Sequence, residues 1–114
     1  MQITEKEIAI VFSWETNDPL GVDFRNLVKS NYKNIQEQNI VIDLTAFKKR
    51  ITPNHILEFS ELSTYSKKQL GKSFVVASST INIHELPNDI SVAPTLQEAL
   101  DLIEMEEIER DLGY

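Results

Sequence analysis

Three short runs of β-branched and aromatic residues are separated along the chain by segments with helical periodicity. The runs cover residues 8–12, 40–44 and 73–77, and each has the length and composition of a β-strand. The run at 40–44 is apolar except for one acid near its end, which is typical of a strand covered on both faces. Strands alternating with helices predict an α/β fold, with a mixed, mainly parallel sheet flanked by helices and residues 40–44 at its centre.

Apolar residues recur at spacings of three and four in residues 23–37 and again after Thr52, which predicts two amphipathic helices. The second helix has clear limits. Thr52 can cap it, Pro53 suits its first position, and Gly71 can supply the left-handed residue that ends it. Its predicted sheet-facing stripe consists of Ile56, Phe59, Leu62 and Tyr65.

The remaining predicted elements are short until the last helix. They are an edge strand near residues 2–4, a helical turn at 81–86 and a strand at 90–92. The last helix opens with a capping box from Thr95 to Glu98, and then places Ala99, Leu100 and Ile103 on one face. The predicted order is β-β-α-β-α-β-α-β-α, in a single domain of residues 1–114 whose acidic C-terminal helix extension covers about 95–114.

The chain carries no sequence signal for a membrane or an oxidising compartment. Its first residues lack a basic and then apolar leader, and no apolar run approaches the roughly 20 residues of a membrane span. The sequence contains no cysteine, which fits a reducing compartment. We therefore expect a cytoplasmic protein that does not bind membranes.

The net charge of −7 is concentrated in one segment. Residues 95–114 contain seven acids and one base, whereas the rest of the chain contains 11 acids and 10 bases and is close to neutral. Proteins that bind nucleic acid directly neutralise phosphates with clustered Lys and Arg. The charge distribution therefore argues against direct nucleic-acid binding.

No constellation of residues indicates an enzyme, a metal site or a cofactor site. Only three glycines occur, so the chain has no phosphate-binding loop of the dinucleotide or Walker type. The two histidines, His55 and His84, lie on different predicted elements and lack the spacing of zinc ligands. The carboxylates of the last helix are predicted to be solvated, without the burial that separates the pKa values of an acid/base pair. We predict a non-catalytic protein without cofactor or metal.

The last helix carries a second apolar stripe, formed by Met105, Ile108 and Leu112. This stripe is offset from the face of Ala99 and Ile103, and it has no evident place on the same sheet. One interpretation is a surface for a protein partner, comprising Met105, Glu106, Glu107, Ile108, Glu109, Arg110 and Leu112. The alternative is that the helix bends onto its own domain, or that its acids meet Lys67, Lys68 and Lys72.

The element order and three segments resemble the STAS domain (sulphate transporter and anti-sigma-factor antagonist). The segments are "IVIDLT" before the capped helix, "GKSFVVAS" as the next strand and "ISVAPTLQEAL" at the start of the last helix. The resemblance spans nearly the whole chain. The ending "APTLQEALDLIEMEEIERDLG" is similar to that of small STAS-like proteins of Bacteroidota, some of which carry the name ribonuclease Z.

The STAS resemblance implies a contact site where the central strand leads into the capped helix. Anti-sigma-factor antagonists carry a phosphorylated serine at the start of this helix, within Asp-Ser-Ser-Gly-Leu, and Thr52 occupies that position here. Only the hydroxyl is kept, because Ile51, Pro53 and Asn54 replace the flanking acid, serine and glycine. Thr52 is therefore first a helix cap and, as a hypothesis, a phosphate acceptor beside a basic loop. The predicted interaction loop comprises Lys48, Lys49, Arg50, Asn54 and His55.

The resemblance thus implies a regulatory domain that binds a protein partner, in the manner of anti-sigma-factor antagonists, with a homodimer as a further possibility. The name ribonuclease Z suggests an alternative, in which the chain is an accessory protein for tRNA 3′ processing. Nucleases of that class bind two metals through a histidine-rich motif, and two histidines cannot supply those ligands.

Overall fold

The computed structural model describes residues 2–16, 38–51, 53–81 and 90–113, excepting the side chains of residues 53–58. The described strands are β1 (Gln2–Glu5), β2 (Ala9–Ser13), β3 (Asn39–Asp43), β4 (Phe74–Ala77) and β5 (Ser91–Ala93). The described helices are α3 (Pro53–Thr64), a π-helical turn η1 (Tyr65–Gln69) and α4 (Leu96–Asp111). The predicted helix at 23–37, the residue Thr52 and most of the predicted turn at 81–86 lie outside the described residues.

The sheet has five strands in the order β1-β2-β3-β4-β5. β1 pairs antiparallel with β2, and the three other pairs are parallel. The predicted mixed, mainly parallel sheet is therefore confirmed, with β3 at its centre. Because the parallel strands all run the same way, the residues that follow β2, β3 and β4 meet at one edge of the sheet, and the residues that precede them meet at the opposite edge.

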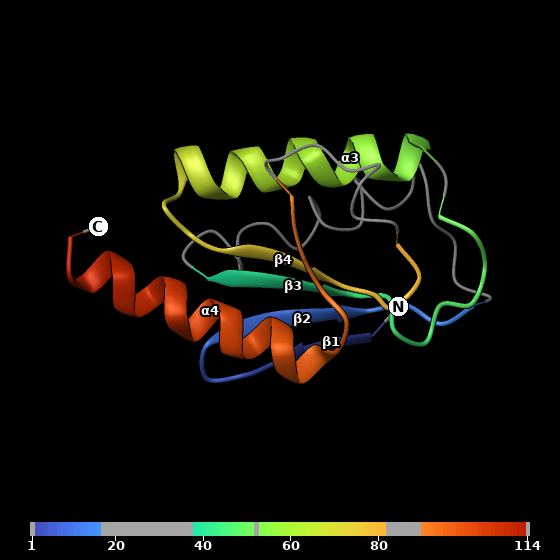
Figure 1. Ribbon diagram of the computed structural model, residues 1–114, viewed down its shortest axis with the longest axis horizontal. Coiled ribbons are helices and arrows are strands. Elements are labelled where there is room, and N and C mark those ends of the chain that lie inside the picture. Colours follow the sequence, from blue (N-terminus) through green and yellow to red (C-terminus); the bar gives the residue numbers. More distant parts are fainter. Residues whose placement is uncertain (1, 17–37, 52, 82–89, 114) are drawn as a thin grey trace.

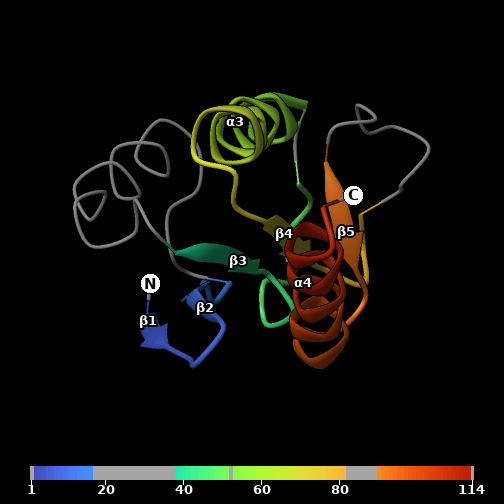
Figure 2. The same ribbon diagram turned by 90° about the vertical axis from the view of Figure 1, so that its left-hand side faces the viewer.

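The two long helices lie on opposite faces of the sheet, α3 on one and α4 on the other (Figures 1 and 2). The core between α3 and the sheet contains large side chains, including Phe12, Phe59 and Phe74. The core beneath α4 is built mainly from small ones, including Ala9, Ala77 and Ala99. Small side chains allow a helix to approach a sheet closely. The core between α3 and the sheet is thus filled by larger side chains than the core beneath α4.

Of the predicted stripe, the structure describes the side chains of Phe59, Leu62 and Tyr65, and Tyr65 departs from the buried face. Phe59 is buried and Leu62 packs against the core, but Tyr65 is 43% exposed. Steps of three residues drift by about 60° each around a helix with 3.6 residues per turn, so Tyr65 falls off the face that Phe59 occupies. Ser63 and Ser66 are buried there instead. The prediction for Tyr65 was wrong for this reason.

Identifiable residues fix where α4 begins and where it ends. The Oγ1 of Thr95 accepts a hydrogen bond from the backbone N–H of Glu98 at 3.1 Å, which confirms the predicted N-cap. At the other end, Gly113 adopts φ +82° and its N–H donates to the carbonyl of Arg110. The helix is therefore closed by a left-handed glycine beyond Asp111. Within the part of the chain that the structure describes, no helix has the length and apolar character to cross a membrane.

Candidate functional site

The loop of residues 45–51 follows β3 at the carboxyl edge of the sheet, and its start is fixed by Asp43. The Oδ1 of Asp43 accepts hydrogen bonds from the backbone N–H and the hydroxyl of Thr45, at 3.0 and 2.6 Å. Its Oδ2 accepts a longer bond of 3.4 Å from the hydroxyl of Ser13, the residue paired with it on β2. A carboxylate that captures the amide two residues on builds an Asx-type turn. Asp43 thus turns the chain at the strand end.

Two apolar side chains and one hydroxyl hold the rest of this basic loop. Phe47 is buried in the core beneath α3, and Ile51 packs partly against the same core. Thr16 donates to the carbonyl of Ala46 at 3.2 Å and accepts from the N–H of Lys48 at 3.0 Å. Because both ends are anchored, the basic loop has a defined shape.

Between these anchors the basic loop presents three cations. Lys48, Lys49 and Arg50 are exposed, and the Nζ of Lys48 donates to the carbonyl of Thr45 at 3.1 Å. The loop leads to α3, which begins at Pro53 as predicted. Thr52 and the side chains of Asn54 and His55 lie outside the described residues, so their predicted roles stay predictions.

A polar cluster joins the last two turns of α4 to the opposite, amino edge of the sheet. It consists of Asn39, Ser73, Glu106, Glu107 and Arg110. Asn39 is only 5% exposed; its Nδ2 donates to Glu107 at 3.0 Å, and its Oδ1 accepts from the N–H of Ser73 at 2.9 Å. Arg110 donates to the hydroxyl of Ser73 at 3.0 Å and forms an ion pair with Glu107. Three of the residues predicted to contact a partner therefore bind their own domain.

The Glu107 carboxylate is the electrostatic centre of this polar cluster. Hydrogen bonds from Arg110 and then from Asn39 lower the pKa of Glu107, and the charges of Arg110 and Lys72 act in the same direction. Partial burial opposes them by a smaller amount. The charge of Lys72 is the smallest of these causes, so the contacts with Arg110 and Asn39 dominate the environment of Glu107.

The outer face of α4 points away from this polar cluster. Met105, Ile108 and Leu112 are 59%, 59% and 67% exposed, so the apolar stripe points to solvent and is not packed against its own domain, which was one of the two alternatives that the sequence left open. Among the described residues they are the most exposed large hydrophobic side chains. Exposed acids Glu104, Glu109 and Asp111 flank the stripe along the helix, and Glu98 and Asp101 are exposed on the turns before it.

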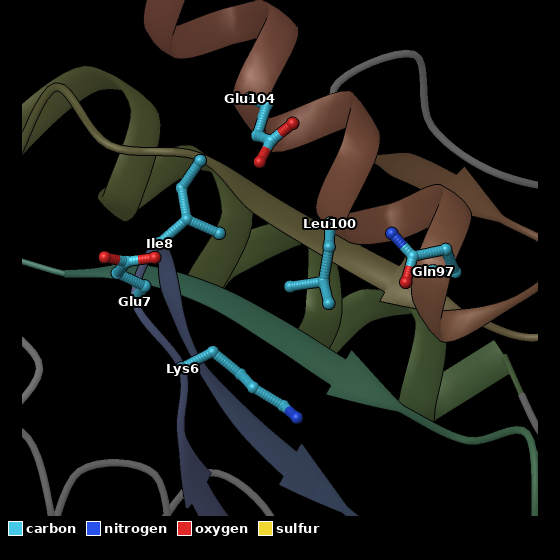
Figure 3. Close-up of a pocket in the computed structure, with 6 residues that line it drawn as sticks. All are labelled: Lys6, Glu7, Ile8, Gln97, Leu100 and Glu104. Atoms are coloured by element: carbon cyan, nitrogen blue, oxygen red, sulfur yellow. The ribbon is translucent and has the colours of Figure 1, made fainter.

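An open groove of about 460 Å³ lies between the β1–β2 turn and α4 (Figure 3). Ile8 and Leu100 supply its apolar side chains, and the polar side chains that line it are Lys6, Glu7, Gln97 and Glu104. The groove brings one cation together with two acids and offers no focus of charge for an ionic ligand. Within the described ranges, no group of three or more His, Asp or Glu side chains could hold a metal ion.

The polar cluster was missed by sequence reasoning. Asn39 and Ser73 each stand directly before or at the start of an apolar run, so parallel pairing of those runs brings both to the same edge. The position of Asn39 and Ser73 at the starts of these runs could therefore have predicted that the two residues lie close together. Their partners on α4 lie 33 to 71 residues away and carry no local mark of the contact.

The comparisons with known proteins show the fold of the chain. No model of a protein family matches the sequence. No curated protein matches it either. Among solved structures, a serine-to-glutamate variant of RsbS from Moorella thermoacetica is similar with a TM-score of 0.70 and 20% identity, covering 96% of this chain and 97% of that chain. The chain therefore has the STAS fold of RsbS, as the resemblance implied.

Proposed function

We propose that this chain is a non-catalytic regulatory domain that acts by binding a protein partner, in the manner of an anti-sigma-factor antagonist. The observation that carries the proposal is the basic loop, in which three exposed cations stand between the anchors Phe47 and Ile51. The structural likeness to RsbS supports it through the fold. The loop occupies the junction between central strand and helix that STAS domains use for contacts.

A loop anchored at both ends suits recognition because little conformational entropy is lost when it binds. Lys48, Lys49 and Arg50 would be matched by an acidic surface on the partner, which favours fast association. Asn54 and His55 follow on the first turn of α3 and would extend the same contact. The partner expected from the STAS resemblance is a sigma-regulatory kinase.

Charge-neutral variants of the basic loop test this proposal. Lys48→Gln, Lys49→Gln and Arg50→Gln together should abolish recovery of the native partner in affinity purification from host cells, quantified by mass spectrometry. A control with Lys6→Gln and Lys68→Gln removes exposed cations elsewhere and should leave recovery unchanged. Recovery of the same partners by both variants would refute the loop as the contact site.

Phosphorylation of Thr52 is a finer proposal about the same junction. A phosphate directly before Pro53 would lie at the amino end of α3, where free backbone amides favour an anion, and close in sequence to Lys48, Lys49 and Arg50. Helix capping alone also accounts for the residue. Intact-mass and peptide analysis of protein from its native host is the test. Thr52 found unmodified in every growth phase would contradict the proposal.

The ending of the sequence supports a second candidate, an accessory role for ribonuclease Z. The same affinity purification separates the two, because it would recover the nuclease in place of a kinase. Metal-dependent cleavage of precursor tRNA by the purified chain would contradict both candidates, since each assigns no catalysis to this chain.

A further inference from the structure

The outer face of α4 combines exposed apolar side chains with charge of one sign. Met105, Ile108 and Leu112 form the stripe, Glu104, Glu109 and Asp111 flank it, and Glu98 and Asp101 are exposed on the turns before it. The only base on this helix is Arg110, and its guanidinium is turned inward to Ser73, Asn39 and Glu107. The exposed surface of α4 is therefore apolar along its middle and anionic on its borders.

Contacts on the sheet-facing side of α4 hold this outer face in place. Ile103 is the last fully buried core residue of α4, so the two turns that carry the stripe extend beyond the hydrophobic core. The polar cluster replaces that core, because Glu107 and Arg110 bond to Asn39 and Ser73 at the sheet edge. The stripe is thus presented on a helix that is already ordered, which reduces the entropic cost of binding.

We propose that the outer face of α4 binds a cationic amphipathic helix of a protein partner, with an apolar centre bordered by Lys and Arg. This inference rests on the proposed function as an interaction domain and names the chemistry of the partner at a second surface. Apolar residues at i, i+3 and i+7 are the anchors through which one amphipathic helix packs against a complementary apolar surface. The bordering acids select cationic over anionic segments by charge complementarity.

A second copy of the chain fits this face poorly. Pairing two α4 helices through their stripes would bring the flanking carboxylates of the two copies close to each other, and like charges across an interface disfavour association. The basic loop of another copy offers cations, but the exposed large hydrophobic residues of the described chain outside α4 are Ile3 and Tyr65, neither of which belongs to that loop. The apolar stripe would stay uncovered.

Site-specific photocrosslinking tests the inference in the full chain. A photoreactive amino acid replaces Ile108, with Ile3 as the control position because it is also an exposed isoleucine but lies on β1. Crosslinking in host cells followed by peptide mapping identifies the captured segment, which is then synthesised and measured against the purified chain. We expect a segment with Lys or Arg on both sides of apolar residues, captured at position 108 and not at position 3.

Binding of that synthetic segment should weaken about tenfold or more in Ile108→Ser, as for a central apolar contact. It should also weaken with added salt, and this salt dependence should shrink in a variant with Glu104→Gln, Glu109→Gln and Asp111→Asn. Capture of this chain itself, capture of an acidic segment, or unchanged affinity in Ile108→Ser would overturn the inference. If position 108 captures nothing while the basic-loop variant still loses its native partner, the inference fails and the proposed function stands.

Discussion

The two edges of the sheet hold their charged groups by different means. At the carboxyl edge, Asp43 turns the chain by bonds to Thr45, two residues on. Phe47 and Thr16 complete the anchoring of the basic loop, through the core and through bonds to Ala46 and Lys48. At the amino edge, Asn39 and Ser73 hold α4 through side chains that are 33 to 71 residues away in sequence. The turn that starts the basic loop is therefore local, whereas α4 is attached to the other edge mainly by tertiary contacts.

This difference implies different responses to damage. A loop with local anchors loses its shape when an anchor is removed, and the loss extends into the core because Phe47 belongs to that core. A helix end held by a polar cluster can detach while the rest of α4 stays packed through Ala99 and Ile103. The first kind of change should appear in global stability, and the second in local protection.

Phe47→Ala should produce the largest effect. Phe47 is 4% exposed, and removing a buried phenyl ring leaves a cavity that costs about 3–5 kcal/mol of unfolding free energy. Urea denaturation followed by circular dichroism measures this quantity. Lys49→Ala, two residues away and exposed, is the control and should change it by less than about 0.5 kcal/mol. A loss below about 1 kcal/mol in Phe47→Ala would show that the ring does not anchor the loop.

Asn39→Ala should have a smaller and more local effect. The substitution removes bonds to the carbonyl of Ile8, the N–H of Ser73 and the side chains of Glu107 and Arg110. Leaving the buried N–H of Ser73 unsatisfied costs about 1–3 kcal/mol. Amide hydrogen exchange should show the loss of protection concentrated in residues 105–112.

Gln97→Ala is the control for Asn39→Ala, because Gln97 also has a side-chain amide that donates to a carboxylate of α4, that of Asp101, but it lies on α4 itself and is exposed. It should leave exchange in residues 105–112 unchanged. A uniform loss of protection along the whole of α4 in Asn39→Ala would mean that the helix end and the core unfold together, contrary to the proposed separation of the two.

The structural features that the sequence predicted are those that depend on residues close together along the chain. Strand positions followed from the apolar runs, the start of α4 followed from Thr95, and the offset of Ile108 from the buried face followed from helical spacing. The interaction role of Lys48, Lys49 and Arg50 was implied by the STAS resemblance and stays a prediction. Tyr65 failed because a spacing of three residues does not track a helix face over two turns.

The contacts of the polar cluster could not be predicted from residues close together along the chain. Arg110 and Glu107 are three residues apart on one helix, which predicts at most a surface ion pair. Their bonds to Asn39 and Ser73 depend on how α4 crosses the sheet, and that is set by the small side chains beneath it, such as Ala77 and Ala99. Global packing therefore decides which acids of the helix face inward.

Glu107→Gln should give the smallest of these effects and the most specific one, because it removes the charge and keeps an acceptor. The folded-state pKa of Glu107 lies below its ordinary value of 4.5, owing first to the Arg110 hydrogen bond and then to that from Asn39, with Lys72 adding to the attraction. As the pH falls, the unfolded chain takes up the proton first. The carboxylate therefore stabilises the fold fully well above pH 4.5, and this contribution is lost as the pH falls through the folded-state pKa.

The measurement is the difference in unfolding free energy between the wild type and Glu107→Gln across the pH range. Since the side chain is 32% exposed, we expect at most about 1 kcal/mol at pH 7, declining at acid pH. Glu109→Gln removes an exposed carboxylate two residues away and should show a smaller difference in unfolding free energy. Equal behaviour of the two variants would place the anchoring of α4 in its core contacts, and would leave the polar cluster with no measurable part in holding the apolar stripe toward solvent.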